Sequence, residues 1–171
     1  MPALEARRDA GQRVLDVACG TGDLSLTLYQ NGKARIVGLD FCRPMLDIAA
    51  SKAVRLGSTV PFVEGDALDL PFSDRSFEAV TIAFGLRNLA SVESGFKELL
   101  RILKPGGRVV VLEFSKPKTP VLRSLFKFYF TRVLPLFGGL VSGSKSAYQY
   151  LPDSVAQFPD QNELALMMGK A

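Results

Sequence analysis

The chain has 171 residues, of which 47% are hydrophobic and 22% are charged. This composition supports one domain with a substantial core and excludes a disordered chain. The net charge is +4 and the basic residues are spread along the chain, so we expect no nucleic-acid interface. The chain has no histidine, and its two cysteines fit no metal-ligand spacing, so we expect no metal site. Residues 1–12 are polar and lack the apolar core of a signal peptide, which predicts a cytoplasmic location.

A strand, a tight turn and a helix are predicted near the start of the chain. Residues 14–18 have the apolar content of a strand, broken by Asp16, and lead into the loop Gly20-Thr21-Gly22. Leucines at positions 24, 26 and 28 then indicate a helix. A glycine-rich turn between a parallel strand and a helix lets the backbone approach a ligand closely. The same turn also serves packing alone in α/β domains, so this motif leaves both interpretations open.

Residues 35–39 predict a second strand that ends at Asp40. In nucleotide-binding α/β folds, an acidic residue about twenty positions beyond the glycine turn accepts hydrogen bonds from ribose hydroxyls. We therefore expect a ligand that contains a ribose. A dinucleotide fits less well, because Asp23 and Leu24 stand where a third glycine is expected. Asp16 and Asp23 also make the loop acidic, which repels phosphate and favours a cationic ligand.

Three further strands are predicted over residues 60–65, 77–84 and 108–114, with a helix over 90–103 between the last two. Asp66 and Ala67 follow the third strand, and Gly85-Leu86-Arg87-Asn88 follows the fourth. Ligands bind at the carboxyl ends of the strands in an open parallel sheet, so these residues are expected beside the glycine loop.

Each of these polar side chains also has a structural interpretation. Asp66 could cap the turn that follows it, Arg87 could pair with a nearby carboxylate, and Asn88 could cap the next helix. The functional interpretation is favoured because acidic side chains recur at successive strand ends, and because Arg87 and Asn88 together supply a permanent cation and a bidentate amide.

The run from Asp16 to Asp23, followed by Asp40, resembles the cofactor-binding motif of class I S-adenosylmethionine methyltransferases. The resemblance implies a Rossmann-like, doubly wound, mostly parallel α/β sheet and S-adenosylmethionine as the cofactor. It implies that Asp66 binds the adenine amino group and that the backbone N–H of Ala67 meets the ring. Ala18 stands where the family usually has glycine, and we expect little effect. The implied cofactor-binding residues are Asp16, Ala18, Gly20, Thr21, Gly22, Asp40, Asp66 and Ala67.

Residues 84–88 and 101–115 are similar to signatures of the quinone-biosynthesis C-methyltransferases, which methylate demethylmenaquinol or a polyprenyl benzoquinol. Residues 148–164 are similar to a further stretch of that family. The resemblance implies C-methylation of a lipophilic prenylated quinol. Arg87 and Asn88 are then the catalytic residues, because Arg87 can stabilise an oxyanion and Asn88 can fix a hydroxyl. Arg87 and Tyr148 are the implied substrate-binding residues.

Residues 120–143 predict an aromatic-rich helix that carries three cations and is broken by Pro135, so it is not expected to span a bilayer. Such a helix can lie on a membrane surface, roof an apolar pocket or pack in the core. We expect one domain over residues 1–171, with a lid-like helical insertion at about 116–158. Contact with the inner face of a membrane and a homodimer are both left open.

The family has helices before the first strand and seven strands in all, so five strands are expected here and the last two are expected to be missing. The activity of the chain is therefore left open. Two rival functions remain. A nicotinamide-dependent oxidoreductase shares the fold but should have a third glycine in the loop. A catalytically inactive methyltransferase-fold binding subunit would bind the cofactor without turnover.

Overall fold

The computed structural model describes residues 11–32, 34–114, 119, 154–155 and 157–170. The chain divides into two compact units, residues 1–113 together with 171, and residues 114–170. Tyr148 and most of the lid-like insertion expected at about 116–158 lie outside the described residues. The insertion and the single-domain organisation therefore stay predictions.

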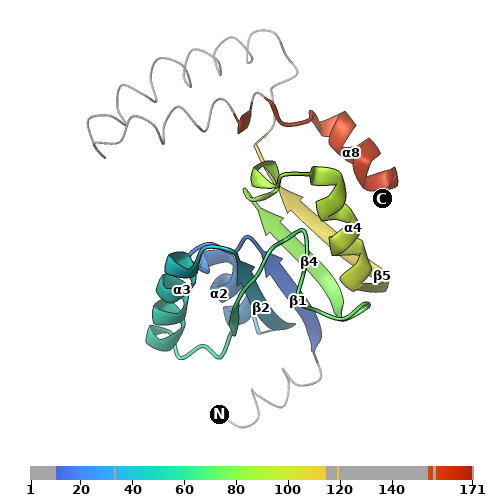
Figure 1. The fold of residues 1–171 in the computed structure, drawn as a ribbon. Coiled ribbons are helices and arrows are strands. Elements are labelled where there is room, and N and C mark those ends of the chain that lie inside the picture. Colours follow the sequence, from blue (N-terminus) through green and yellow to red (C-terminus); the bar gives the residue numbers. More distant parts are fainter. Residues whose placement is uncertain (1–10, 33, 115–118, 120–153, 156, 171) are drawn as a thin grey trace, which may run out of the picture. The chain divides into compact units, whose positions relative to one another are not determined.

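A five-stranded parallel sheet in the order β3-β2-β1-β4-β5 forms the first unit (Figure 1). The chain runs outward from β1 to β3 and then returns to β4 and β5, so the direction of winding reverses between β1 and β4. This is the predicted Rossmann-like α/β fold, and ligands bind at such a reversal. The strands are β1 (Gln12–Val17), β2 (Ala34–Asp40), β3 (Phe62–Glu64), β4 (Phe77–Ala83) and β5 (Leu103–Leu112). The helices of this unit are α2 (Asp23–Gln30), α3 (Arg43–Arg55), the 3-10 turn η1 (Leu86–Asn88) and α4 (Val92–Ile102).

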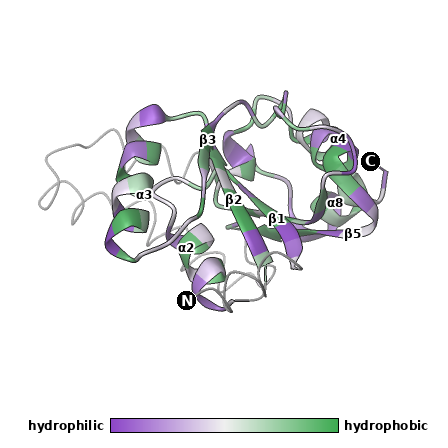
Figure 2. Cartoon of the chain, turned by 90° about the horizontal axis from the view of Figure 1, so that it is seen from below, coloured by the Kyte–Doolittle hydropathy of each residue, from purple (hydrophilic) through white to green (hydrophobic). Residues whose placement is uncertain are grey.

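Two of the three interior strands of the sheet, β1 and β4, contribute much of the core. Leu15 and Val17 of β1 and Val80 and Ile82 of β4 are almost fully buried, while β1 begins with exposed residues. Figure 2 colours the strands and helices of this unit by the hydropathy of each residue, from hydrophilic to hydrophobic. Helix α4 buries Phe96 and the apolar residues on the same face, as its strong 3.6-residue periodicity requires.

The fifth strand begins earlier than predicted. We expected it to start at Arg108, but β5 begins at Leu103, which pairs with Phe77 of β4. Ala79 then pairs with Arg108, so residues 104–107 form an irregularity in the register between two paired stretches. The sequence Pro105-Gly106-Gly107 therefore lies inside the irregular start of this strand.

The second unit contains a helix that the sequence analysis did not predict, α8 (Gln161–Lys170). The carboxylate of Asp160 accepts hydrogen bonds from the backbone N–H groups of Asn162 and Glu163, at 2.8 and 3.0 Å. Glu163 in turn accepts from the backbone N–H of Asp160, which completes a reciprocal N-terminal cap. In the part of the chain that the structure describes, no helix is both long and apolar enough to cross a membrane.

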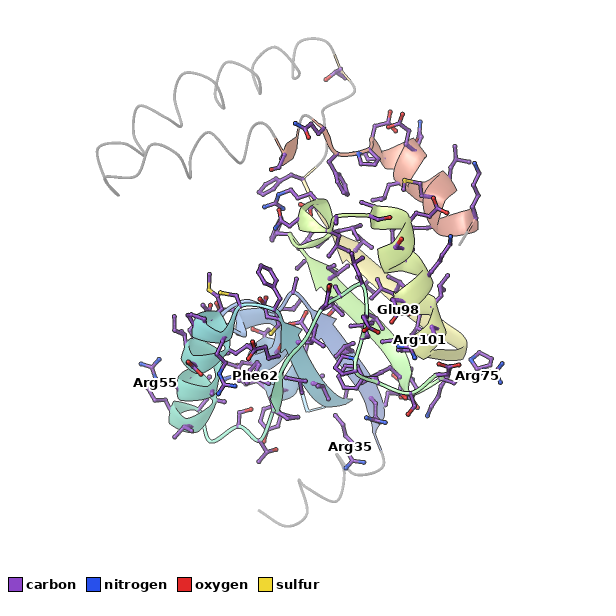
Figure 3. All side chains as sticks on the ribbon, in the orientation of Figure 1. Arg35, Arg55, Phe62, Arg75, Glu98 and Arg101 are labelled. Carbon is purple, nitrogen blue, oxygen red and sulfur yellow. The ribbon has the colours of Figure 1, made fainter. Side chains whose placement is uncertain are left out.

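The ring of Phe62 (Figure 3) packs against Gly22 of the glycine loop and Gly38 of β2. A Cβ atom on Gly22 would lie 2.8 Å from this ring, and one on Gly38 would lie 2.6 Å from it. Gly22 also has a φ of +78°, which strongly favours glycine. Both glycines are therefore required for packing, whatever Gly22 contributes to a ligand.

Ala18 and Gly85 meet where β1 and β4 end. Ala18 has a φ of +54°, in the left-handed region that L-residues avoid. A Cβ atom on Gly85 would lie 2.3 Å from the Cβ of Ala18, although the backbone of Gly85 is right-handed and suits any residue. Ala18 was expected to matter little, but its methyl group excludes every side chain at position 85.

Arg101 of α4 holds the connection between β3 and β4 in place (Figure 3). Its guanidinium donates to the carbonyl oxygens of Leu70 and Phe72 and to the carboxylates of Asp74 and Glu98, at 2.8–3.0 Å. Glu98 also accepts from the backbone N–H of Leu70 at 3.0 Å. The hydrogen bond from Arg101 lowers the pKa of the Glu98 carboxyl.

We expect Arg101→Ala to lower the free energy of unfolding at pH 7 by about 2 kcal/mol, because two backbone carbonyls lose a charged donor.

Since the pKa of Glu98 is lowered on folding, the contribution of Glu98 to the free energy of unfolding is present above its ordinary pKa of 4.5. This contribution is lost as the pH falls through the pKa of the folded state. Urea unfolding between pH 3 and 7 should show a shallower acid loss for Glu98→Gln. Lys97→Ala removes an exposed pair with Glu93 and is the control. Identical acid slopes would contradict this role for Glu98.

A double-mutant cycle tests the contact between Ala18 and Gly85. Gly85→Ala alone should destabilise the protein by about 2 kcal/mol or more, because two methyl groups cannot share this space. In the Ala18→Gly background the next neighbour of the new methyl group is Ile82, at 3.5 Å, so Gly85→Ala should be tolerated. Urea unfolding of all four proteins should give a coupling energy above about 1 kcal/mol, whereas additive effects would exclude the contact.

Candidate functional site

A cavity of about 520 Å³ opens at the carboxyl ends of the parallel strands. Its walls include Ala18 and Gly20 after β1, residues 40–42 at the end of β2, residues 65–68 after β3 and Asn88 after β4. No lysine or arginine is found among the described residues that line it. The cavity therefore lies where the winding of the sheet reverses, which is the usual ligand position in this fold.

Asp40 joins two of these walls. Its Oδ2 accepts a hydrogen bond from the backbone N–H of Gly20 at 2.8 Å, and its Oδ1 accepts from the backbone N–H of Cys42 at 2.9 Å. The residue is only 7% exposed, so the carboxylate is held in one orientation. An ionised carboxylate has about four acceptor positions, which leaves acceptor capacity for the hydroxyl groups of a ligand.

Asp66 serves the turn and the cavity at the same time. Its Oδ1 accepts from the backbone N–H of Leu68 at 2.8 Å, so the predicted turn-capping interaction is present. The side chain is also exposed on the cavity wall, and no described residue donates to its Oδ2. Ala67 lines the same wall next to it. The two interpretations of Asp66 are therefore compatible.

Asp16 lies away from the cavity, although we expected it to bind the cofactor. It is 1% exposed, and its carboxylate accepts hydrogen bonds from the hydroxyls of Ser25 at 2.6 Å and Thr81 at 2.9 Å. Burial raises the pKa of this carboxyl, and the two hydroxyl donors counteract the rise. Asp16 therefore links α2 to β4 behind the glycine loop.

The glycine loop is less acidic than expected, because Lys52 of α3 forms an ion pair with Asp23. Its Nζ donates to Asp23 at 2.7 Å and to the hydroxyl of Thr21 at 2.9 Å. The hydrogen bond from Lys52 to Asp23 lowers the pKa of the Asp23 carboxyl. Neither Thr21 nor Asp23 lines the cavity. The negative charge that faces a ligand therefore comes from Asp40 and Asp66.

The thiol of Cys19 is kept protonated. Burial raises its pKa to about 12, and the nearby charges of Asp16 and Asp40 act in the same direction. A thiol with so high a pKa is almost entirely neutral at pH 7 and is a poor nucleophile. Cys19 therefore contributes packing to the loop.

Arg87 is placed behind the cavity wall, although we expected it to act as a catalytic cation. It forms an ion pair with Glu113, and the two side chains are only 10% and 3% exposed. Its Nη1 also donates to the carbonyl oxygen of Phe84 at 2.8 Å. Arg87 does not line the cavity, so the structure favours the alternative in which it pairs with a carboxylate.

Asn88 is exposed on the cavity wall. The alternative in which it caps α4 is wrong, because the cap is Ser91, whose hydroxyl accepts from the backbone N–H of Ser94 at 3.1 Å. Asn88 therefore presents an amide to the cavity from the short turn η1.

The predicted site residues thus divide into two groups. The cavity brings together Ala18, Gly20, Asp40, Asp66, Ala67 and Asn88. Asp16, Thr21, Gly22 and Arg87 support these residues from outside the lining, and Tyr148 lies outside the described residues.

Sequence analysis missed the apolar part of the cavity. Phe41, Met45, Leu68, Phe84 and Leu89 all line it. Phe41 follows Asp40 directly, Leu68 lies two positions after Asp66, Leu89 follows Asn88 directly, and Phe84 ends the strand predicted over residues 77–84. The rule that ligands lie at strand ends could therefore have identified Phe41, Leu68 and Phe84 as well.

The chain matches the model of the ubiE/COQ5 methyltransferase family over residues 4–171. It is 52% identical over 167 residues to a demethylmenaquinone methyltransferase of Thermus thermophilus, covering 97% of this chain and 76% of the relative. It is 46% identical to the ubiquinone/menaquinone biosynthesis C-methyltransferase UbiE of Geotalea daltonii, covering 91% of this chain and 68% of the relative.

Solved structures have the same fold. The YcgJ protein of Bacillus subtilis is 29% identical with a TM-score of 0.61, and the match covers 77% of this chain and 56% of that one. A SAM-dependent methyltransferase of Thermotoga maritima superposes with a TM-score of 0.65 at 24% identity, over 98% of this chain and 67% of that one. The chain thus spans little more than half the length of the first of these structures. With the family match over almost all of its length, the chain belongs to the ubiE/COQ5 methyltransferase family.

Proposed function

We propose that this protein transfers a methyl group from S-adenosylmethionine to a ring carbon of a prenylated quinol in menaquinone or ubiquinone biosynthesis. The observation that carries the proposal is the cavity, which places two carboxylates and an amide at the strand ends without a lysine or arginine in its described lining. Family membership and the names of the Thermus and Geotalea relatives support the same reaction.

The cavity fits S-adenosylmethionine better than a dinucleotide. Asp40 suits ribose hydroxyls, because its carboxylate is held by Gly20 and Cys42 and has acceptor capacity left. Asp66 and Ala67 suit an adenine edge, which presents an amino donor and a ring acceptor. A pyrophosphate would meet two carboxylates here and no compensating cation in the described lining. This disfavours the oxidoreductase alternative.

S-adenosylmethionine supplies an electrophilic methyl group on a positively charged sulfur. Ionisation of a quinol hydroxyl, with its proton passing to water, spreads negative charge onto the adjacent ring carbon. That carbon forms the new carbon–carbon bond as the carbon–sulfur bond breaks, and loss of the ring proton restores the aromatic ring. Asn88 can hold the hydroxyl by its amide, so that the ring carbon stays aligned with the methyl group.

Arg87 is then a positioning residue. Its ion pair with Glu113 is nearly neutral as a unit, so it offers little net charge to a developing oxyanion. Its hydrogen bond to the carbonyl of Phe84 instead fixes the segment that carries Asn88. Tyr148 remains a proposed substrate contact. A prenylated substrate partitions into lipid, so we place the protein in the cytoplasm, with substrate exchange at the inner membrane surface.

Asp40→Asn should raise the dissociation constant for S-adenosylmethionine at least tenfold, because a charged acceptor becomes a neutral amide beside the ribose. Isothermal titration calorimetry measures the change, and titration with NAD tests the rival cofactor. Asp69→Asn removes a carboxylate outside the cavity and should bind as the unsubstituted protein does. Unchanged affinity in Asp40→Asn, or tight binding of NAD, would contradict the assignment.

Arg87→Met should lower stability by about 3 kcal/mol, because it leaves Glu113 buried without its partner. Arg87→Met with Glu113→Gln should recover most of this stability. If Arg87 positions the segment, the double variant should still lose at least tenfold in kcat for methylation of a demethylated quinol, with the KM for S-adenosylmethionine unchanged.

Arg87→Lys should retain part of the kcat that the double variant loses, because a lysine can still donate to the carbonyl of Phe84. Arg55→Ala removes an exposed cation of α3 and serves as the control. Full activity in the double variant would show that the ion pair contributes only stability. Cofactor binding without any methylation by the unsubstituted chain would favour the inactive binding subunit.

A further inference from the structure

Phe84 adopts an unusual backbone conformation directly after β4. Its φ is +57°, in the left-handed region, which is a true outlier for a bulky aromatic residue. Such conformations are energetically unfavourable, and they persist only where surrounding contacts impose them. Side chains held in this way cluster at ligand sites.

Both backbone polar groups of Phe84 are fixed. Its N–H donates to the carbonyl oxygen of Leu112 in β5 at 2.8 Å. Its carbonyl oxygen accepts from Nη1 of Arg87 at 2.8 Å, and Arg87 is itself held by Glu113. The buried ion pair and the neighbouring strand therefore impose the left-handed conformation.

The side chain of Phe84 remains 42% exposed and lines the cavity. Asn88 lies on the same stretch of wall, four positions along the chain, and the backbone N–H of Asn88 donates to Gly85 at 3.0 Å. This wall therefore combines an aromatic face with an amide. That combination matches an aromatic ring that carries a hydroxyl group.

The sheet order separates this wall from the polar wall of the cavity. Asp40 ends β2 and Asp66 follows β3, and both strands lie on one side of β1. Phe84 and Asn88 follow β4 on the other side. The two halves of the cavity thus have different chemistry. A nucleoside fits the β2–β3 side, which leaves the β4 side for the methyl acceptor.

We infer that Phe84 is the aromatic platform on which the quinol ring lies, held in place through its carbonyl by Arg87 and Glu113. The inference rests on the proposed function, because it names the position of that substrate in the cavity. Stacking on Phe84 orients the ring so that its hydroxyl reaches Asn88. Phe84 is then a residue that selects for a flat aromatic acceptor.

Equilibrium binding tests the platform without requiring turnover. The probe is a short-chain 1,4-naphthoquinol, kept reduced under anaerobic conditions and titrated by calorimetry into the protein saturated with S-adenosylhomocysteine. Phe84→Leu should weaken binding of the probe about tenfold and Phe84→Ala by more, because aromatic stacking is lost. Phe84→Tyr keeps the ring and should bind within about threefold of the unsubstituted protein.

Binding of S-adenosylhomocysteine to each variant shows that the fold and the polar wall are intact, and it should change by less than about twofold. Val54→Ala removes an exposed apolar side chain of α3 and is the matched control. Equal quinol affinity in Phe84→Leu and the unsubstituted protein would overturn the inference. So would parallel losses of S-adenosylhomocysteine and quinol binding, or no binding of the probe at all.

The outcome for the proposed function is separate. If the probe binds in a manner that depends on Phe84 while a demethylated quinol is never methylated, the platform stands and the proposed reaction fails. If methylation proceeds at the same kcat/KM in Phe84→Leu, the reaction stands and the platform fails.

Discussion

The whole site depends on the position of one carboxylate. Asp40 ends β2, yet it accepts a hydrogen bond from the loop after β1 and another from the start of α3. Two segments that are distant in the sequence are thereby fixed around one group. Removal of this carboxylate would leave two backbone N–H groups unpaired in a largely buried place, and an unpaired buried donor costs about 1–3 kcal/mol. The same group is therefore structural and available to a ligand.

Small residues make this arrangement sterically feasible. Gly22 and Gly38 leave room for the ring of Phe62, and Gly85 leaves room for the methyl group of Ala18. Ala18 and Gly85 line the cavity themselves, whereas Gly22, Gly38 and Phe62 lie outside its lining and support it from behind. Many of the residues that belong to the sequence motif act in this second way.

The hydrophobic pattern of the sequence was enough to locate five strands and the carboxylates at their ends, and the family resemblance implied that the strands are mostly parallel. Asp40 and Asp66 were found on that basis. The direction in which a polar side chain points depends on partners elsewhere in the chain. Arg87 turns away from the cavity because β5 brings Glu113 beside it, and Asp23 turns away because α3 supplies Lys52. These pairings depend on tertiary packing, which a local motif does not specify.

Strand β5 is the last strand in the described sheet order, and Val110 and Leu112 on it are each 55% exposed. A strand edge with apolar side chains offers a row of hydrogen-bonding groups that another β-strand can join. Unless another segment covers this edge, the molecule will tend to associate through intermolecular sheet extension as its concentration rises. Self-association in solution would then depend on a part of the fold that is remote from the cavity.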